Sequence, residues 1–400
     1  MILKKYPAMR IFSCRVKVCR IYNQRFCHEQ VRFHQENSWK QAWKIGFPHQ
    51  VSNYRYIGGT PEIKTLLSSA LMNETASHTD IRPGLNTEKW PWKSEHPREE
   101  PPEGPGISVI TPSFNQVEYI EATMLSVLNQ PCANLEYLVV DGGSKDGSVG
   151  VIQPYREQLA WFESEPDRGQ ADAINKGINR AAGEWIAFIN SDDFFLPGAL
   201  ATITRHIRQT RSRWIAAGIQ VLGDDGKDYG ERYPEVENPD DLQAWLTYRN
   251  QVPQQGCFIH RSVFNEIGLF DADLHYAFDL DFWIRLITAG ICPDIVREPV
   301  AVFRIQDESK SMSGRLPFIK DHRRILRKHR ASLSGSEFHV NTRKLNKMEA
   351  GERIYSAANH AECNNRTEAV RQLKKALRLR KTSSLKRPFW GAVKRIIGGR

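Results

Sequence analysis

The sequence predicts an α/β fold built around a mostly parallel sheet, with a helical extension at its C-terminal end. From Ile107 onward, short apolar runs alternate with helical stretches, which is the pattern of βαβ units. Polar clusters follow three of these runs, at Pro112–Asn115, Asp141–Asp146 and Asn190–Asp193. Ligands of such sheets bind beyond the carboxyl ends of the strands, so the clusters indicate a ligand site at that edge.

The first half of the fold is the more regular. Apolar runs at 107–111, 135–141, 160–165 and 184–190 predict four strands, and the stretch 171–182 predicts a helix between the last two. Right-handed crossovers between such strands give an open, doubly wound sheet.

The second half predicts an α+β arrangement with strands at 214–221 and 256–260 and a helix at 279–289. Beyond it, 318–331 and 344–381 have basic, amphipathic helical patterns. The latter stretch has the small-residue spacing of a tetratricopeptide-like helix pair. Because one pair is too few for a repeat array, we expect a packed helical hairpin.

Three regions follow from these patterns: a poorly ordered extension with a linker over 1–104, the α/β domain over 105–310, and a basic helical region over 311–400. Residues 1–71 show no sustained period, and translation starting at Met72 is an equally good interpretation. The linker at 93–106 holds four prolines, which remove backbone donors and block helix formation.

The charge of the 400-residue chain is unevenly distributed. Residues 101–309 carry 16 basic and 31 acidic side chains, whereas 310–400 carry 24 basic and 6 acidic ones. A nucleic-acid enzyme would place positive charge around its active site, so an acidic middle favours a metal cofactor and excludes nucleic acid as a partner.

Several other features bear on location and class. No apolar run approaches the ~20 residues of a membrane span, and the N-terminus lacks the apolar core of a secretory signal. Seven scattered cysteines fit a reducing compartment, so we expect a cytoplasmic protein. No phosphate-binding glycine loop of the nucleotide-triphosphate type is present in the sequence.

Two acidic motifs follow apolar strands. Asp141 precedes two glycines, so its carboxylate can accept a nucleobase N–H where backbone approaches closely, although Asp-Gly is also ordinary turn chemistry. Asp192 and Asp193 lie on a loop directly after a strand, where a divalent cation would offset their repulsion. A solvated turn is the alternative for this pair.

The third acidic motif, AFDLDFW, places Asp279 and Asp281 at the start of a helix. Side chains two apart on a helix point in different directions, so at most one faces a given pocket. That carboxylate can act as general base for a hydroxyl nucleophile, and the alternative is a helix N-cap.

The order and spacing of five motifs resemble the family 2 glycosyltransferases of the GT-A fold: ISVITPSFNQ, YLVVDGGSKDGS, SEPDRGQADAINKG, AFINSDD and AFDLDFWIRL. The resemblance covers 107–310. It implies a Rossmann-like domain, a UDP- or GDP-linked sugar donor, a divalent cation (Mg²⁺ or Mn²⁺) and inversion at the anomeric carbon. By position it implies donor contacts from Pro112, Asn115, Asp141, Arg168 and Asp192, metal binding by Asp193, general-base catalysis by Asp279, and acceptor binding by Gln255 and Gly256.

The chain departs from the family pattern at Asn190, where Asp is usual, and at Gln306, where similar members carry His. The QxxRW signature of processive polymerases is missing. We therefore expect a non-processive enzyme that adds one sugar to a glycan or lipid-linked acceptor in cell-surface polysaccharide synthesis. A non-catalytic nucleotide-sugar-binding subunit is the alternative that Asn190 and Gln306 leave open.

The C-terminal stretch 385–397 alternates basic groups with an apolar helical face around Trp390. Such a segment can lie in the headgroup region of an anionic membrane, near a lipid-linked acceptor at the inner membrane face. Docking onto the acidic α/β domain is the alternative.

Overall fold

The computed structural model describes Pro91, residues 103–224, 226–236, 251–306, 315–363 and 365–379, and Val393. Most of the predicted N-terminal extension and linker lies outside these residues, as does all but Val393 of the stretch 385–397, for which membrane binding is a prediction. Within them, no helix is both long and apolar enough to cross a membrane.

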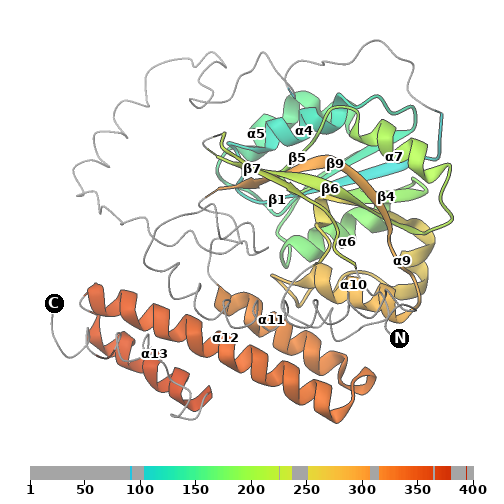
Figure 1. The fold of residues 1–400 in the computed structure, drawn as a ribbon. Helices are drawn as coiled ribbons and strands as arrows, with labels where there is room; N and C mark the ends of the chain where they lie inside the picture. The colour runs from blue at the N-terminus through green and yellow to red at the C-terminus, as the bar shows by residue number, and fades with distance from the viewer. Residues whose placement is uncertain are drawn as a thin grey trace, which may run out of the picture. The chain divides into compact units, whose positions relative to one another are not determined.

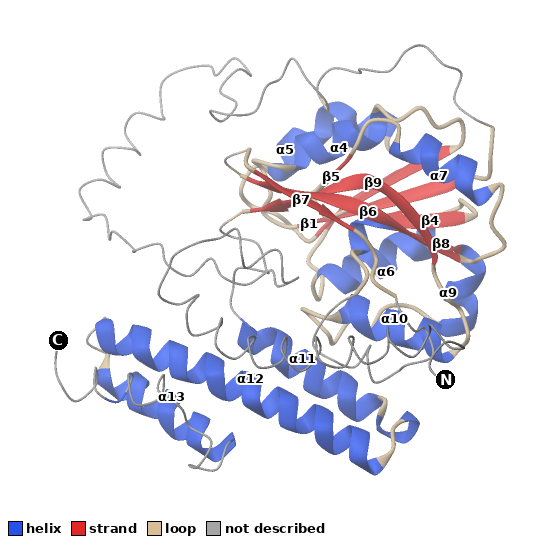
Figure 2. Ribbon diagram, in the orientation of Figure 1, coloured by secondary structure: helices blue, strands red, loops and turns tan. Residues whose placement is uncertain are grey.

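One mixed sheet forms the centre of the fold, with helices on both of its faces (Figures 1 and 2). Its strand order is β3-β2-β1-β4-β8-β6-β9-β5, and β7 pairs with β6. The strands are β1 (Ile107–Ser113), β2 (Leu135–Asp141), β3 (Trp161–Ser164), β4 (Trp185–Phe188), β5 (Phe194–Phe195), β6 (Trp214–Gly223), β7 (Asp228–Arg232), β8 (Cys257–His260) and β9 (Asp294–Ile305).

The four strands predicted first, β1 to β4, form a wholly parallel half of the sheet. The β6–β9 pair is parallel too and spans most of both strands, whereas β8 joins the two halves by antiparallel pairing with β4 and β6. The α/β fold class with a mostly parallel sheet is confirmed.

Helices α4, α5 and α7 cover one face of the sheet, and α6, α9 and α10 cover the other (Figure 2). The helices are α4 (Ile120–Leu128), α5 (Ser148–Ile152), α6 (Gln170–Arg180), α7 (Ala199–Ile207), α9 (Arg261–Ile267), α10 (Phe278–Thr288), α11 (Arg315–Lys328), α12 (Gly335–Glu362) and α13 (Arg366–Leu379). Short 3₁₀ turns lie at η1 (Gln153–Gln158), η2 (Gln254–Gly256) and η4 (Arg330–Ser332).

The core on the α10 side is rich in aromatic rings. Trp214 of β6 stacks on Trp283 of α10 with ring centroids 4.9 Å apart, and Phe270 packs against Phe282 at 4.5 Å. The same core continues into α11 through Ile319, Ile325 and Leu326. Helix α11 is therefore packed onto the α/β domain by apolar burial.

The two following helices confirm the predicted helical hairpin. Ala357 of α12 and Leu373 of α13 form a small apolar core between them, and Arg353 Nη1 donates to Gln372 Oε1 at 2.8 Å. Helix α12 begins with a capping box in which Ser334 and Glu337 bond each other's backbone N–H groups.

A substitution at Gly256 tests how closely η2 packs against the sheet. A Cβ added there would overlap the backbone of Ala217 in β6. We expect Gly256→Ala to lower the free energy of unfolding by about 1–3 kcal/mol, the usual cost of overpacking. Gly351→Ala is the matched control, since its added Cβ meets open space on α12 and should stabilise by about 0.5–1 kcal/mol. Urea denaturation measures both, and unchanged stability of Gly256→Ala would contradict this packing.

Candidate active site at the carboxyl edge of the sheet

The structure brings the three predicted polar clusters to one edge of the sheet. Strand β1 pairs with β2 on one side and β4 on the other, and Ser113 at its end lies opposite Asp141. The loops after β1, β2 and β4 therefore leave the sheet as neighbours.

Asp141 closes β2 with a fully buried carboxylate. Its Oδ2 accepts hydrogen bonds from the backbone N–H groups of Gly143 (3.1 Å) and Ser144 (2.8 Å) and from the hydroxyl of Ser164 (2.7 Å). The Ser144 hydroxyl donates to Oδ1 at 2.5 Å. A carboxylate offers about four acceptor positions, so these four hydrogen bonds fix the orientation of the Asp141 side chain.

The loop after β1 exposes the aromatic side chain of Phe114, which no sequence motif singled out as a site residue. Phe114 is 60% exposed, which is unusual for a ring in this fold. Asn115 has a left-handed backbone (φ 52°), and its N–H and side-chain oxygen bond Ser144 and Lys145 of the neighbouring loop. A Cβ on Gly142 would lie 3.2 Å from the Phe114 ring, so this glycine permits the close packing.

Asp193 lies on the turn between β4 and β5, as predicted, but its side chain is buried with 0% exposure. Its Oδ2 accepts from the amides of Asn190 (3.1 Å) and Gln255 (2.9 Å), and its Oδ1 accepts from the backbone N–H of Arg304 (2.9 Å). Burial, and repulsion from neighbouring Asp192, raise the pKa of the Asp193 carboxyl well above its ordinary value.

Arg304 supplies a buried positive charge beside this turn. Its guanidinium lies 5.0 Å from the Tyr119 ring centroid and 5.2 Å from that of Phe194, a cation–π arrangement on two sides. Burial lowers its pKa, while the charges of Asp193 and Asp192 favour its charged form. Its Nη1 and Nη2 are buried, and neither has a hydrogen-bond partner in the described part of the chain.

Asp192 is the more accessible carboxylate of the pair, because it is only half-buried. Gln306 at the end of β9 donates from Nε2 to Asp192 Oδ2 at 3.1 Å, so the position where similar members carry His does reach the acidic turn. Asn190 in turn accepts from Gln170 Nε2 at 2.5 Å.

The donor set of this turn suits a hard divalent cation in part. Mg²⁺ prefers oxygen ligands and is commonly held by one or two carboxylates together with substrate phosphates. The described residues contain no group of three or more His, Cys, Asp or Glu side chains placed to hold a metal alone. The oxygens of Asp192 fit a cation whose remaining ligands come from a diphosphate and water.

Helix α10 carries the third acidic motif. Asp279 is half-buried in its first turn, and the backbone N–H of Leu280 donates to its Oδ1 at 2.8 Å. Asp281 is fully buried and points into an ion network with Arg285, Lys328 and His329. As expected for side chains two apart on a helix, the two carboxylates have different surroundings.

The remaining predicted site residues have varied surroundings. Pro112 is buried within β1, and Arg168 is exposed and paired with Asp172 at 3.0 Å. Gln255 and Gly256 are buried, and the Gln255 amide bonds Asp193. These contacts support a role for Gln255 in holding the acidic turn, and acceptor binding by this pair stays a prediction.

Comparison with known proteins identifies the family. Residues 108–268 match the family described as glycosyl transferase family 2. Over 253 residues the chain is 31% identical to an uncharacterized glycosyltransferase of Mycobacterium tuberculosis, covering 59% of this chain and 93% of the relative. The chain belongs to glycosyltransferase family 2.

This glycosyltransferase is also 29% identical over 213 residues to the putative teichuronic acid biosynthesis glycosyltransferase TuaG of Bacillus subtilis, covering 52% of this chain and 82% of TuaG. Its fold matches residues 1–349 of S. aureus TarS, crystallised with UDP-GlcNAc, at a TM-score of 0.50 and 17% identity, covering 74% of this chain and 89% of that one. It covers 54% of a longer crystallised TarS chain, with a TM-score of 0.48. The predicted GT-A fold is confirmed.

The different surroundings of the two neighbouring carboxylates can be tested by their effects on stability. Asp193→Ala would leave buried donors unpaired beside buried Arg304, so we expect the free energy of unfolding to fall by about 3–5 kcal/mol. Asp192→Ala removes the hydrogen bond that Gln306 donates to a half-buried carboxylate, and we expect a loss of about 1 kcal/mol. Urea denaturation measures both, and equal losses would contradict the burial difference described here.

Proposed function

We propose that this chain is an inverting, non-processive glycosyltransferase that moves a sugar from a nucleotide-diphosphate donor to a glycan or lipid-linked acceptor. The observation that carries the proposal is the half-exposed carboxylate of Asp192 at the carboxyl edge of the sheet, on a chain of this family. A second half-exposed carboxylate, Asp279, begins α10.

The donor base would meet the loops after β1 and β2. Phe114 offers an exposed ring on which a base can stack. Asp141, whose buried carboxylate bonds the backbone of the loop after β2, remains a proposed base contact. The UDP-GlcNAc bound to TarS supports a nucleotide-sugar donor, and its UDP or GDP type stays a prediction. Asn115 and Arg168 remain proposed donor contacts.

A divalent cation, when bound, would neutralise charge on the departing diphosphate. Asp192 would hold it through oxygen, since this carboxylate is accessible while both oxygens of Asp193 already accept protein donors. In this proposal Asp193 keeps the turn in place, so it contributes to cation binding through its neighbour.

Asp279 would remove the proton from the acceptor hydroxyl as that oxygen attacks the anomeric carbon. The bond from that carbon to the diphosphate oxygen breaks on the opposite face, so the configuration inverts. The first turn of α10 favours the ionised carboxylate through the positive end of the helix dipole, and this is the form that can accept a proton.

The acceptor class is proposed from relatives. TuaG is named for teichuronic acid biosynthesis, and a relative from Mycobacterium bovis, 27% identical over 185 residues, is named for PGL/p-HBAD biosynthesis. Both names support a cell-surface glycan or glycolipid acceptor.

Cation dependence is the first test of this function. We expect the full chain to release nucleoside diphosphate from one member of a UDP- and GDP-sugar panel only with Mg²⁺ or Mn²⁺ present, because a cation held by Asp192 and the donor phosphates would neutralise the departing diphosphate. Release is measured with and without excess chelator. Donor binding without turnover across the panel would instead favour the non-catalytic subunit.

The base is tested by Asp279→Asn. General-base assistance contributes about 10²–10⁴ in rate, so we expect kcat to fall by that factor with donor affinity nearly unchanged. Asp273→Asn, an exposed carboxylate in the preceding loop, is the control and should retain wild-type kcat. An Asp279→Asn enzyme with wild-type turnover would remove Asp279 from this role.

A further inference from the structure

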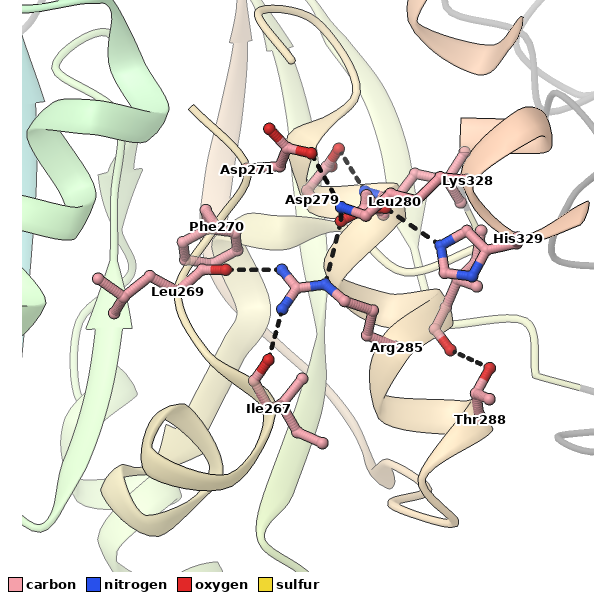
Figure 3. A network of polar contacts seen from close by, with 12 residues as sticks. Ile267, Leu269, Phe270, Asp271, Asp279, Leu280, Arg285, Thr288, Lys328 and His329 are labelled. Atoms are coloured by element: carbon pink, nitrogen blue, oxygen red, sulfur yellow. Dashed lines mark hydrogen bonds and ion pairs between the residues drawn. The ribbon is translucent and has the colours of Figure 1, made fainter. Parts of the chain in front are cut away.

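Asp281 is a fully buried carboxylate that the proposed chemistry does not use. It accepts hydrogen bonds from three side-chain nitrogens: Arg285 Nε at 3.0 Å, Lys328 Nζ at 2.9 Å and His329 Nε2 at 3.1 Å. Arg285 belongs to α10 itself, whereas Lys328 ends α11 and His329 follows it directly. Figure 3 shows this network, in which the side chains of Arg285, Lys328 and His329 converge between the two helices.

The network needs all of its donors because an uncompensated buried carboxylate is costly. Burial by itself raises the pKa of Asp281, but the hydrogen bonds from His329 and Lys328 and the charge of Arg285 hold that pKa below its ordinary value. The carboxylate is therefore ionised at neutral pH, and it binds the end of α11 by charge as well as by hydrogen bonds.

Helix α11 also holds the segment that leads into α10. Asp321 accepts the backbone N–H of Tyr276 at 2.7 Å, and Lys328 reaches Asp271 at 2.8 Å. Arg324 donates to the backbone oxygen of Asp273. The loop directly before Asp279 is thus held by α11 at three points, and Asp281 is held just after it.

On the other side, Arg285 extends the network to the end of α9. Its Nη1 donates to the carbonyl of Ile267 at 2.9 Å and its Nη2 to that of Leu269 at 2.7 Å. The network therefore joins the end of α11 to the end of α9, and Asp281 at its centre fixes the first turn of α10.

We propose that Lys328 and His329 are positioning residues for the transfer reaction: through Asp281 they hold the first turn of α10 so that Asp279 meets the acceptor hydroxyl. The proposal rests on the function of Asp279 given above. Its physical reason is that general-base catalysis depends on hydrogen-bond reach, and a displacement of 1 Å can cost about 10²-fold in rate. The end of α11 then contributes to catalysis although it supplies no group to the chemistry.

The test compares steady-state kinetics of Lys328→Met and His329→Leu with those of the wild-type chain. We expect kcat for transfer to fall about 10- to 100-fold while the donor KM changes less than about twofold, since α10 is displaced but the loops after β1, β2 and β4 are not. Lys328→Arg and His329→Gln keep a donor in place and should recover most of the rate. Arg327→Gln removes a neighbouring exposed charge and should leave kcat unchanged.

A double-mutant cycle separates positioning from general destabilisation. With Asp279→Asn already present, Lys328→Met should cause little further loss of kcat, because the group it positions is gone. Equal fold losses in both backgrounds would overturn the proposal, as would a lowered melting temperature with unchanged kcat. Lys328 is 40% exposed, so its variants keep the test available if His329→Leu fails to fold.

The transfer activity of the wild-type chain distinguishes failure of the proposed function from failure of the positioning inference. No transfer by wild type across the donor panel would count against the proposed function. Transfer by wild type together with wild-type kcat in Lys328→Met and His329→Leu would overturn the positioning inference alone.

Discussion

The carboxylate of Asp193, sealed from solvent, fixes the geometry of the carboxyl edge of the sheet. Its oxygens accept hydrogen bonds from Gln255 of η2 and from the backbone N–H of Arg304 in β9. The backbone carbonyl of Asp193 also accepts a hydrogen bond from the hydroxyl of Thr123 in α4 at 2.6 Å. Elements from three distant parts of the chain thus meet at one residue. Because an unsatisfied buried polar group costs about 1–3 kcal/mol, each of these elements depends on the others for its place.

The acidic turn with Asp192 and Asp193 and the start of α10 with Asp279 and Asp281 have the same arrangement. In each, one carboxylate is buried and bonded by protein donors, and its close neighbour in sequence is half-exposed: Asp193 beside Asp192, and Asp281 near Asp279. The buried member fixes the backbone through its hydrogen bonds and so positions the half-exposed member.

Local patterns predicted most of the fold. The apolar runs of β1, β2, β3 and β4 and the helical period of α6 and α10 lie within a residue or two of their predicted bounds, because continuous apolar runs and a helical period are both visible among neighbouring residues. The polar clusters at the strand ends were visible for the same reason. The sequence also indicated the family, since motif order needs no three-dimensional information.

Which carboxylate is buried could not be predicted, because the partners lie far away in the chain. Gln255 reaches Asp193 from η2 and Arg304 reaches it from β9, while His329 reaches Asp281 from just beyond α11. These pairings depend on sheet register and helix packing, which no local window contains. The exposure of Phe114 could not be predicted either, because an aromatic residue directly after a strand is expected to lie in the core. Arg304, inside the apolar β9, carried no signal beyond its charge.

The packing of α11 shows that the folded unit extends beyond the boundary suggested by composition. Composition changes near residue 310, from acidic to basic, but the apolar core runs on through Ile319, Ile325 and Leu326. A chain cut at that compositional boundary would open this core to water and take two of the three donors away from Asp281. When such domains are exchanged or fused, the unit that stays folded therefore includes α11, and the same core continues beyond it into α12 through Leu345.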